Sequence, residues 1–189
     1  KDYEPSEESL EKVLELNRKY NILIEEGEEV SRNIRWQLKS LEWDNLFNYG
    51  KGNKVNFEKL NGVVGVFGKN FSGKSSIIDS LLFTLFNSTS KNVRKNLNII
   101  NQNCNSGRGK AEIMIGDKVF SIERSTEKYV KKLKGEETLE AKTDLDVSSY
   151  DLATEEKESH NGLTRIDSDK NIKKILGTLE DFLLTSMSS

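Results

Sequence analysis

An eight-residue run in the first half of the chain has the residue types and the spacing of a phosphate-binding loop. The run reads G-x-x-x-x-G-K-S, from Gly68 to Ser75. Glycines in this pattern let the backbone wrap around a β-phosphate, and successive N–H groups converge on the anion at a helix N-terminus. Lys74 is expected to reach the β- and γ-phosphates, and the Ser75 hydroxyl to ligate Mg²⁺. The run therefore predicts a binding site for ATP or GTP.

The predicted nucleotide-binding residues belong to this loop and to the start of the following helix. They are Gly68, Asn70, Phe71, Ser72, Gly73, Lys74, Ser75 and Ser76. We expect the backbone N–H groups of residues 70–76 to hold phosphate together with the Lys74 ammonium, which is also the predicted catalytic group. Ser75 is the predicted metal ligand.

The segments on either side of the loop indicate the elements that position it. The apolar run from Val63 to Phe67 is typical of a strand that is buried on both faces. After the loop, apolar residues recur at i, i+4 and i+8, which predicts a helix with a wide apolar stripe. The stripe consists of Ile77, Leu81 and Leu85 with Ile78, Leu82 and Phe86. Strand, glycine loop and helix together are the context that the motif requires, whereas an accidental glycine turn would lack it.

Length and composition restrict the class of protein. With 189 residues, of which 34% are hydrophobic, the chain can form one domain with a core, or one domain with an appendage. No apolar stretch approaches the roughly 20 residues of a membrane span, and no signal peptide is evident. We therefore expect a cytoplasmic or nucleoid-associated protein with no membrane partner. Because the chain begins at Lys1 and ends in an apolar segment, we also expect it to be a fragment of a larger protein.

Cysteine and histidine are too scarce for several kinds of site. Cys104 and His160 are the single representatives of their types. This excludes an intrachain disulfide and a cysteine metal cluster, and it leaves little for a hydrolase triad or a multi-histidine metal centre. The metal chemistry that remains is Mg²⁺ bound through oxygen ligands.

The net charge of −2 hides an uneven distribution of charge. Residues 1–33 contain ten acidic and five basic residues, whereas residues 69–110 contain seven basic residues and one acidic residue. The seven are Lys69, Lys74, Lys91, Arg94, Lys95, Arg108 and Lys110. A basic segment of this kind favours binding of a polyanion. Nucleotide phosphate is the nearest candidate, and DNA is a further one. The alternative is a solvated charged surface.

Before the loop, the pattern predicts a helix and then two strands. Ser6 is a suitable N-cap for an amphipathic helix that runs to Tyr20. From residue 34 the apolar residues alternate, which is the periodicity of a strand. They are Ile34, Trp36, Leu38, Leu41 and Trp43. A turn cluster at residues 48–53 then leads to a second strand around Val55.

After the loop helix, the pattern predicts a polar connection over residues 87–105 and then a β-meander. A hairpin over residues 112–124 turns at Gly116, and strands at residues 129–133 and 138–147 extend it. Residues 134–160 are compatible with an edge hairpin or with a partly ordered loop. A helix is then predicted from Asp169 to Leu176, with Asp167 and Ser168 as its N-terminal cap and Gly177 at its end. A last helix follows, and Thr178 and Asp181 are expected to form a capping box at its start.

This order of elements resembles the N-terminal half of the head domain of the SMC-like ATPases, and most closely the branch with the bacterial SbcC type and its phage counterparts. The residues that match beyond the bare loop are Asn45, Asn70, Ser72, Ser76, Ile77 and Asp79, with Arg124-Ser125, Ile172–Gly177 and Phe182–Ser186 further on. The resemblance implies an α/β P-loop NTPase fold, the N-terminal lobe of an ABC ATPase head, with an antiparallel β-meander. It covers residues 34–189 and leaves residues 1–33 as an N-terminal helical extension or the end of an upstream domain.

The resemblance also implies a function. In such proteins ATP and Mg²⁺ are held between two heads, so that a second copy of the head, DNA and a nuclease subunit are the expected partners in double-strand-break repair, recombination or replication. The signature motif, the Q-loop glutamine and the water-activating carboxylate are expected outside this chain. The full-length protein is therefore expected to be an ATPase, and this chain alone to hydrolyse ATP poorly.

Two departures from the family pattern and two alternative functions remain. Phe71 stands where the family usually has Gly, so that either its backbone adopts that conformation with a β-carbon present, or the loop differs locally. Phe47 stands where several members have Arg, so that nucleotide contacts of that arginine cannot be assigned here. The alternatives are another P-loop enzyme, such as a small-molecule kinase or a GTPase, and a nucleotide-dependent interaction module that does not hydrolyse.

Overall fold

The computed structural model describes residues 12, 16, 36–90, 96–133 and 136–186. The chain divides into two units, residues 1–33 and residues 34–189. In the first unit the described residues are Lys12 and Leu16, which are helical and exposed. The predicted helix from Ser6 to Tyr20 otherwise lies outside the described residues, and the role of the first unit stays a prediction.

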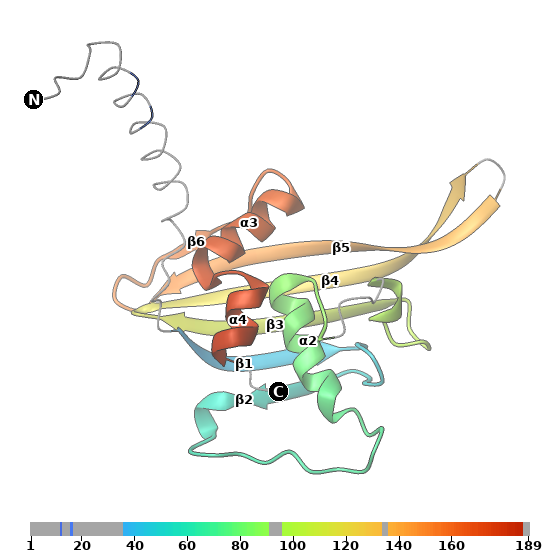
Figure 1. Cartoon of the computed structure of the whole chain (residues 1–189), viewed down its shortest axis with the longest axis horizontal. Helices are drawn as coiled ribbons and strands as arrows, with labels where there is room; N and C mark the ends of the chain where they lie inside the picture. The colour runs from blue at the N-terminus through green and yellow to red at the C-terminus, as the bar shows by residue number, and fades with distance from the viewer. Residues whose placement is uncertain (1–11, 13–15, 17–35, 91–95, 134–135, 187–189) are drawn as a thin grey trace, which may run out of the picture. The chain divides into compact units, whose positions relative to one another are not determined.

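The second unit is built on a six-stranded antiparallel sheet with the order β2-β1-β3-β4-β5-β6 (Figure 1). The strands are β1 (Trp36–Asp44), β2 (Asn53–Asn56), β3 (Ser106–Ile115), β4 (Lys118–Leu133), β5 (Glu136–Asp151) and β6 (Lys157–Ser159). The helices are α2 (Lys74–Phe86), α3 (Arg165–Leu176) and α4 (Leu179–Ser186), with short 3-10 turns η1 (Phe57–Lys59) and η2 (Asn96–Asn98). The predicted α/β fold class is confirmed, and so are the two strands before the loop, the loop helix and the meander.

Local irregularities in the sheet explain two breaks in the sequence pattern. In β1 the register shifts between Leu38 and Ser40, which leaves Lys39 as an extra residue opposite β3. This bulge turns both Leu38 and Leu41 toward the core although they are three residues apart. Gly116 adopts a φ of +57° between β3 and β4, as a tight hairpin turn requires.

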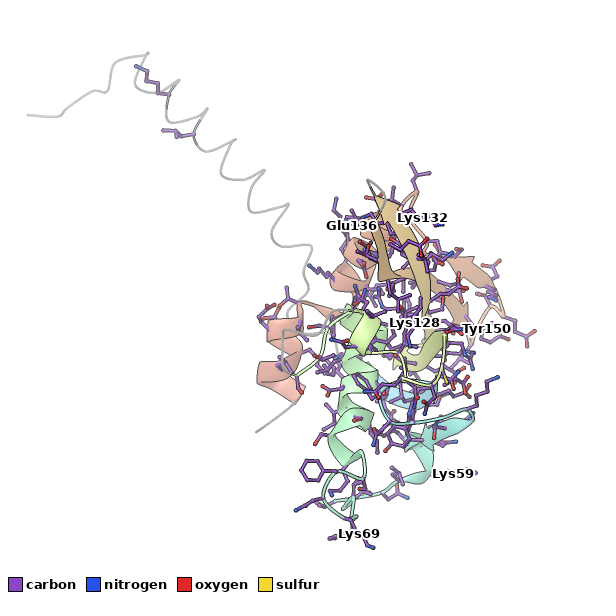
Figure 2. All side chains as sticks on the ribbon, turned by 90° about the vertical axis from the view of Figure 1, so that its right-hand side faces the viewer. Lys59, Lys69, Lys128, Lys132, Glu136 and Tyr150 are labelled. Atoms are coloured by element: carbon purple, nitrogen blue, oxygen red, sulfur yellow. The ribbon has the colours of Figure 1, made fainter. Side chains whose placement is uncertain are left out.

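Residues 134–160 include two strands. For this segment the sequence was compatible with either an edge hairpin or a partly ordered loop. β4 and β5 pair along their whole length, from Lys118 opposite Asp151 to Leu133 opposite Glu136. β6 then pairs with the end of β5. The C-terminal part of β4 and the N-terminal part of β5 extend beyond the helices as a two-stranded arm, with Lys132 and Glu136 near its tip (Figures 1 and 2). Charged side chains on such free edges disfavour pairing with other strands.

The core lies between the sheet and the helices. Leu82, Phe83 and Leu85 of α2 are at most 1% exposed. They belong to one cluster with the inward residues of the sheet and with residues of α3 and α4. The other buried members are Leu41, Trp43, Leu46, Ile99, Ala111, Ile113, Ile122, Val147, Ile172, Leu176 and Phe182. Five of the six residues predicted for the apolar stripe of α2, all except Ile78, pack into this core. Ile78 is 43% exposed, and Phe83, which the prediction left out, is fully buried.

The predicted strand from Val63 to Phe67 is wrong. This segment belongs to no strand, and its apolar side chains face solvent, with Val63 103% and Phe67 94% exposed. A strand needs neighbours to receive its backbone hydrogen bonds, and among the described residues no strand pairs with this segment. The apolar pattern alone does not show whether, or by which part of the protein, these side chains are buried.

The start of α3 also differs from the prediction. The N-cap is Thr164, and the helix begins at Arg165, four residues earlier than expected. The Thr164 hydroxyl accepts a hydrogen bond from the Asp167 backbone N–H at 3.3 Å and donates to the Asp167 carboxylate at 2.8 Å. Asp167 is therefore part of a capping box rather than the cap itself. The end at Gly177 and the pairing of Thr178 with Asp181 are confirmed.

A buried arginine joins α2 to the sheet. Arg124 of β4 is 0% exposed, and its guanidinium donates to the backbone oxygens of Thr84 at 3.0 Å and Leu85 at 3.3 Å. These carbonyls lie in the last turn of α2, where helices lack internal partners. The same guanidinium donates to Asp169 of α3 at 2.7 Å. Burial lowers the pKa of Arg124 below its ordinary value, and the hydrogen bond to Asp169 opposes that shift.

We expect Arg124→Met to lower the free energy of unfolding by roughly 2–4 kcal/mol, because it removes charged hydrogen bonds to buried carbonyls. Urea unfolding followed by circular dichroism measures this loss. Arg108→Met is the matched control, since Arg108 binds Asp44 at 3.0 Å on the exposed face of the sheet, and we expect it to cost less than about 1 kcal/mol. Equal losses in the two variants would show that burial of Arg124 contributes nothing.

Candidate functional site

The phosphate-binding loop wraps around its own lysine. The Lys74 ammonium donates to the backbone oxygens of Gly68 and Lys69, both at 2.7 Å. The Ser72 N–H donates to the Lys69 oxygen at 3.2 Å, which closes the turn. The loop therefore keeps a cation at its centre, in the position where a phosphate would be neutralised.

The N-terminus of α2 is suited to an anion. Its N-cap, Gly73, provides no side-chain hydrogen bond, and no acidic residue lies in the first turn. The first N–H groups of a helix have no internal partner, and the helix dipole adds positive potential there. A bound phosphate would therefore supply the acceptor that the chain itself does not.

Two residues of the loop have backbone conformations in the left-handed region. Gly73 has a φ of +95°, and a β-carbon on it would lie 2.7 Å from the Asn48 side chain, so that glycine is required on both grounds. Phe71 has a φ of +63° and is 101% exposed. Phe71 therefore has a backbone conformation that favours glycine, with its side chain exposed to solvent.

A cavity of about 890 Å³ lies beside the loop. Every predicted nucleotide-binding residue except Gly68 lines it. The rest of its wall comes from two other segments, the β1–β2 turn and the connection after α2. These residues are Phe47, Asn48, Asn98, Ile100, Asn101, Gln102 and Asn103. None of the residues that line the cavity is an Asp or Glu.

Hydrogen bonds hold the three segments of the cavity wall together. The Tyr49 hydroxyl donates to the Gly73 oxygen at 3.1 Å, which joins the β1–β2 turn to the loop. Asn101 donates from its backbone to the Asn45 oxygen at 2.8 Å and from its side chain to the Tyr49 oxygen at 3.1 Å. Asn45, which matches the family pattern, is 8% exposed with a φ of +53°. These bonds connect the three segments of the cavity wall to one another.

The sequence prediction missed the contribution of residues 98–103. It treated residues 87–105 as a polar connection, although Asn101 and its neighbours meet the loop across the β1–β2 turn. The signal that was available is the density of amide side chains in this stretch, with Asn98, Asn101, Gln102 and Asn103 within six positions. Lys128 of β4 donates to the Asn101 oxygen at 3.3 Å and supports the stretch from its other side.

The basic residues that were predicted to bind a polyanion lie in different surroundings in the structure. Lys69 projects from the loop (Figure 2), and Lys74 lines the cavity. Arg108 contacts Asp44 at 3.0 Å and Glu123 at 3.4 Å, while Lys110 lies 3.8 Å from Glu112. Lys91, Arg94 and Lys95 lie outside the described residues. Arg108 and Lys110 therefore match the alternative of a solvated charged surface.

No group of three or more His, Cys, Asp or Glu side chains that could hold a metal occurs in the described part of the chain. Ser75 lines the cavity and stays the predicted Mg²⁺ ligand. Among the described residues, no helix combines the length and the apolar character needed to cross a bilayer.

Comparison with known proteins places the chain among nucleotide-binding domains. A family model described as an AAA domain matches residues 40–188. An uncharacterized protein of Acanthamoeba polyphaga mimivirus is 28% identical over 198 residues, which is 96% of this chain and 14% of that protein. The SbcC component of the SbcCD nuclease from Clostridium acetobutylicum is 36% identical over 87 residues, 45% of this chain and 7% of that protein. The chain thus spans only a small part of each relative.

Solved structures of the recombination mediator protein RecF are also similar to this chain. The structure of RecF with ATP aligns with a TM-score of 0.43 and 18% identity, over 58% of this chain and 28% of the RecF chain. A second RecF structure aligns with a TM-score of 0.42 and 18% identity, over 56% and 26%.

We expect Gly73→Ala to weaken binding of Mg²⁺-triphosphates at least about tenfold, because the new β-carbon meets a left-handed backbone and the Asn48 side chain. Calorimetric titration measures the affinity. Gly50→Ala is the control, since nothing lies within 4 Å of a β-carbon there, and it should leave the affinity unchanged. Unaltered binding by Gly73→Ala would contradict the assignment of the loop.

Proposed function

The chain belongs to the AAA-domain family, and on that basis we propose that it is the ATP-binding half of an SbcC-like ATPase head that acts in DNA double-strand-break repair, recombination or replication. The family match and the identity with the SbcC component of SbcCD confirm the resemblance to SMC-like and SbcC-type ATPases. The nucleotide, the metal, the partners and hydrolysis by the whole protein belong to the proposal.

The observation that carries the proposal is the Lys74 ammonium at the uncapped N-terminus of α2, beside a cavity of about 890 Å³. Phosphate oxygens would take the place of the Gly68 and Lys69 carbonyls as acceptors for Lys74. The backbone N–H groups of residues 70–76 would hold the remaining oxygens. In this arrangement the β- and γ-phosphates are bound by one cation and by fixed dipoles.

The residues present fit a magnesium ion. Mg²⁺ prefers oxygen ligands and keeps several waters, so that one hydroxyl and the phosphate oxygens suffice to hold it. The Ser75 hydroxyl lines the cavity one residue after Lys74 and has no competing acidic neighbour in the first turn of α2. When bound, the ion would neutralise charge that develops on the phosphates.

Binding and hydrolysis have different requirements in this chain. No carboxylate lines the cavity, so that among the described residues no Asp or Glu is placed to activate water. Asp79 of α2 is 4% exposed and accepts a hydrogen bond from the Ser90 N–H at 2.8 Å, which is a structural contact. We therefore propose that the chain binds ATP and that the water-activating group comes from another part of the ATPase head.

The exposed segment before the loop supports this division. Val63, Val66 and Phe67 are 103%, 60% and 94% exposed, directly before a phosphate-binding loop. Apolar segments in this position are buried when strands flank them on both sides. We propose that a second lobe of the head supplies those strands, and with them the signature motif and the carboxylate.

Dimerisation of two such heads is the proposed mechanism of the whole protein. A γ-phosphate that is bound by one head and contacted by its partner stabilises the closed dimer, and hydrolysis removes that contact. Closure would then control engagement of DNA or of a nuclease subunit. The alternative of an interaction module that binds ATP without hydrolysis predicts the same binding by this chain but no turnover by the whole protein.

We expect the chain to bind Mg²⁺-ATP, Lys74→Ala to abolish this binding, and turnover to be negligible in both. Calorimetry and a phosphate-release assay measure the two properties. Lys69→Ala is the matched control, because Lys69 belongs to the same loop but does not line the cavity, and it should change the affinity by less than about threefold. Robust turnover by the isolated chain would show that the catalytic carboxylate is already present.

A further inference from the structure

We propose that the amide side chains of residues 98–103 read the nucleobase and select adenine over guanine. The proposal rests on the proposed function, because it concerns another part of the wall of the same cavity. This inference gives a function to residues 98–103, which the sequence analysis described only as part of a polar connection.

The cavity connects the phosphate loop to this segment. Lys74 and Ser75 line one part of its wall, and Asn98, Gln102 and Asn103 line another. Its volume of about 890 Å³ is in the range of sites that enclose whole small-molecule ligands. A nucleoside triphosphate anchored at the loop therefore has room for its base beside residues 98–103.

The backbone of this segment is fixed while three of its side chains are available. The Asn103 N–H donates to the Asn101 side chain at 3.0 Å, and Asn101 itself is bonded to Tyr49. By contrast, the amide groups of Asn98, Gln102 and Asn103 have no hydrogen-bond partner among the described residues, and all three side chains are exposed. Amides on a fixed backbone that face a cavity are suited to a polar ligand edge.

The chemistry of the lining favours adenine. An Asn or Gln amide can donate to N7 and accept from the N6 amino group of adenine at the same time. Guanine presents two donors, at N1 and N2, which carboxylates accept best, and two acceptors, at O6 and N7, which arginine binds best. The cavity lining contains neither a carboxylate nor an arginine.

Phe47 provides a surface for either base. Its backbone has a φ of +54°, and its N–H donates to the Ile99 oxygen at 2.7 Å, which places Phe47 beside the amide segment. Phe47 lines the cavity and also packs against the core. Stacking on an aromatic ring strengthens binding of every base, so we assign affinity to Phe47 and selectivity to the amides.

The test compares the affinities for ATP, GTP and inorganic tripolyphosphate, each with Mg²⁺, by calorimetry on the 189-residue chain. We expect the unaltered chain to bind ATP at least about tenfold more tightly than GTP. The double variant Gln102→Ala with Asn103→Ala should lose most of this preference, while its affinity for tripolyphosphate is unchanged. Asn105→Ala is the control, because Asn105 is exposed on the same connection but does not line the cavity.

A second variant tests the donor and acceptor argument directly. Asn103→Asp replaces an amide by an acceptor of the same shape, and it should shift the ratio of affinities toward GTP. Equal affinities for ATP and GTP in the unaltered chain, or a preference that survives the double variant, would overturn the inference. A failure to bind ATP, GTP and tripolyphosphate alike would instead contradict the proposed function.

Discussion

The position of helix α2 depends on a guanidinium that is buried in the sheet. Arg124 binds the last carbonyls of α2 and Asp169 of α3, so that one side chain joins the phosphate-loop helix to β4 and to the C-terminal helices. The close approach of α2 to the sheet also requires Gly109, because a β-carbon there would collide with Thr84. The N-terminus of the helix is thereby held at a fixed place, where its free N–H groups and Lys74 face the cavity.

The two sides of α2 differ in how completely they are covered. Toward the sheet, the apolar face of the helix is packed, and antiparallel pairing joins all the strands from β2 to β6. Toward the loop, Val63, Phe67 and Phe71 are exposed, and the cavity wall contains no acidic group. The sheet and its helices therefore form a packed support. The proposed nucleotide site has on one side the loop that we propose to bind phosphate, and the described residues of its lining include no carboxylate that could catalyse hydrolysis.

Features that depend on near neighbours in the chain were predictable from the sequence, and features that depend on distant segments were not. The loop, α2 and the hairpin at Gly116 follow from glycine positions and from apolar periodicity. The segment from Val63 to Phe67 was misjudged, because strand formation needs partners that its own pattern does not reveal. The contribution of Asn98 to Asn103 was missed for a related reason, since it arises only when Asn101 is bonded to Asn45 and Tyr49.

Hydrogen–deuterium exchange with and without Mg²⁺-ATP tests most directly whether the loop binds phosphate. We expect slower exchange of the backbone amides of residues 70–76 when Mg²⁺-ATP is present, because these N–H groups would become donors to phosphate oxygens. The effect should be absent in Lys74→Ala. Unchanged exchange at residues 70–76 at ATP concentrations that saturate binding would contradict the account, because the nucleotide would then occupy another part of the protein.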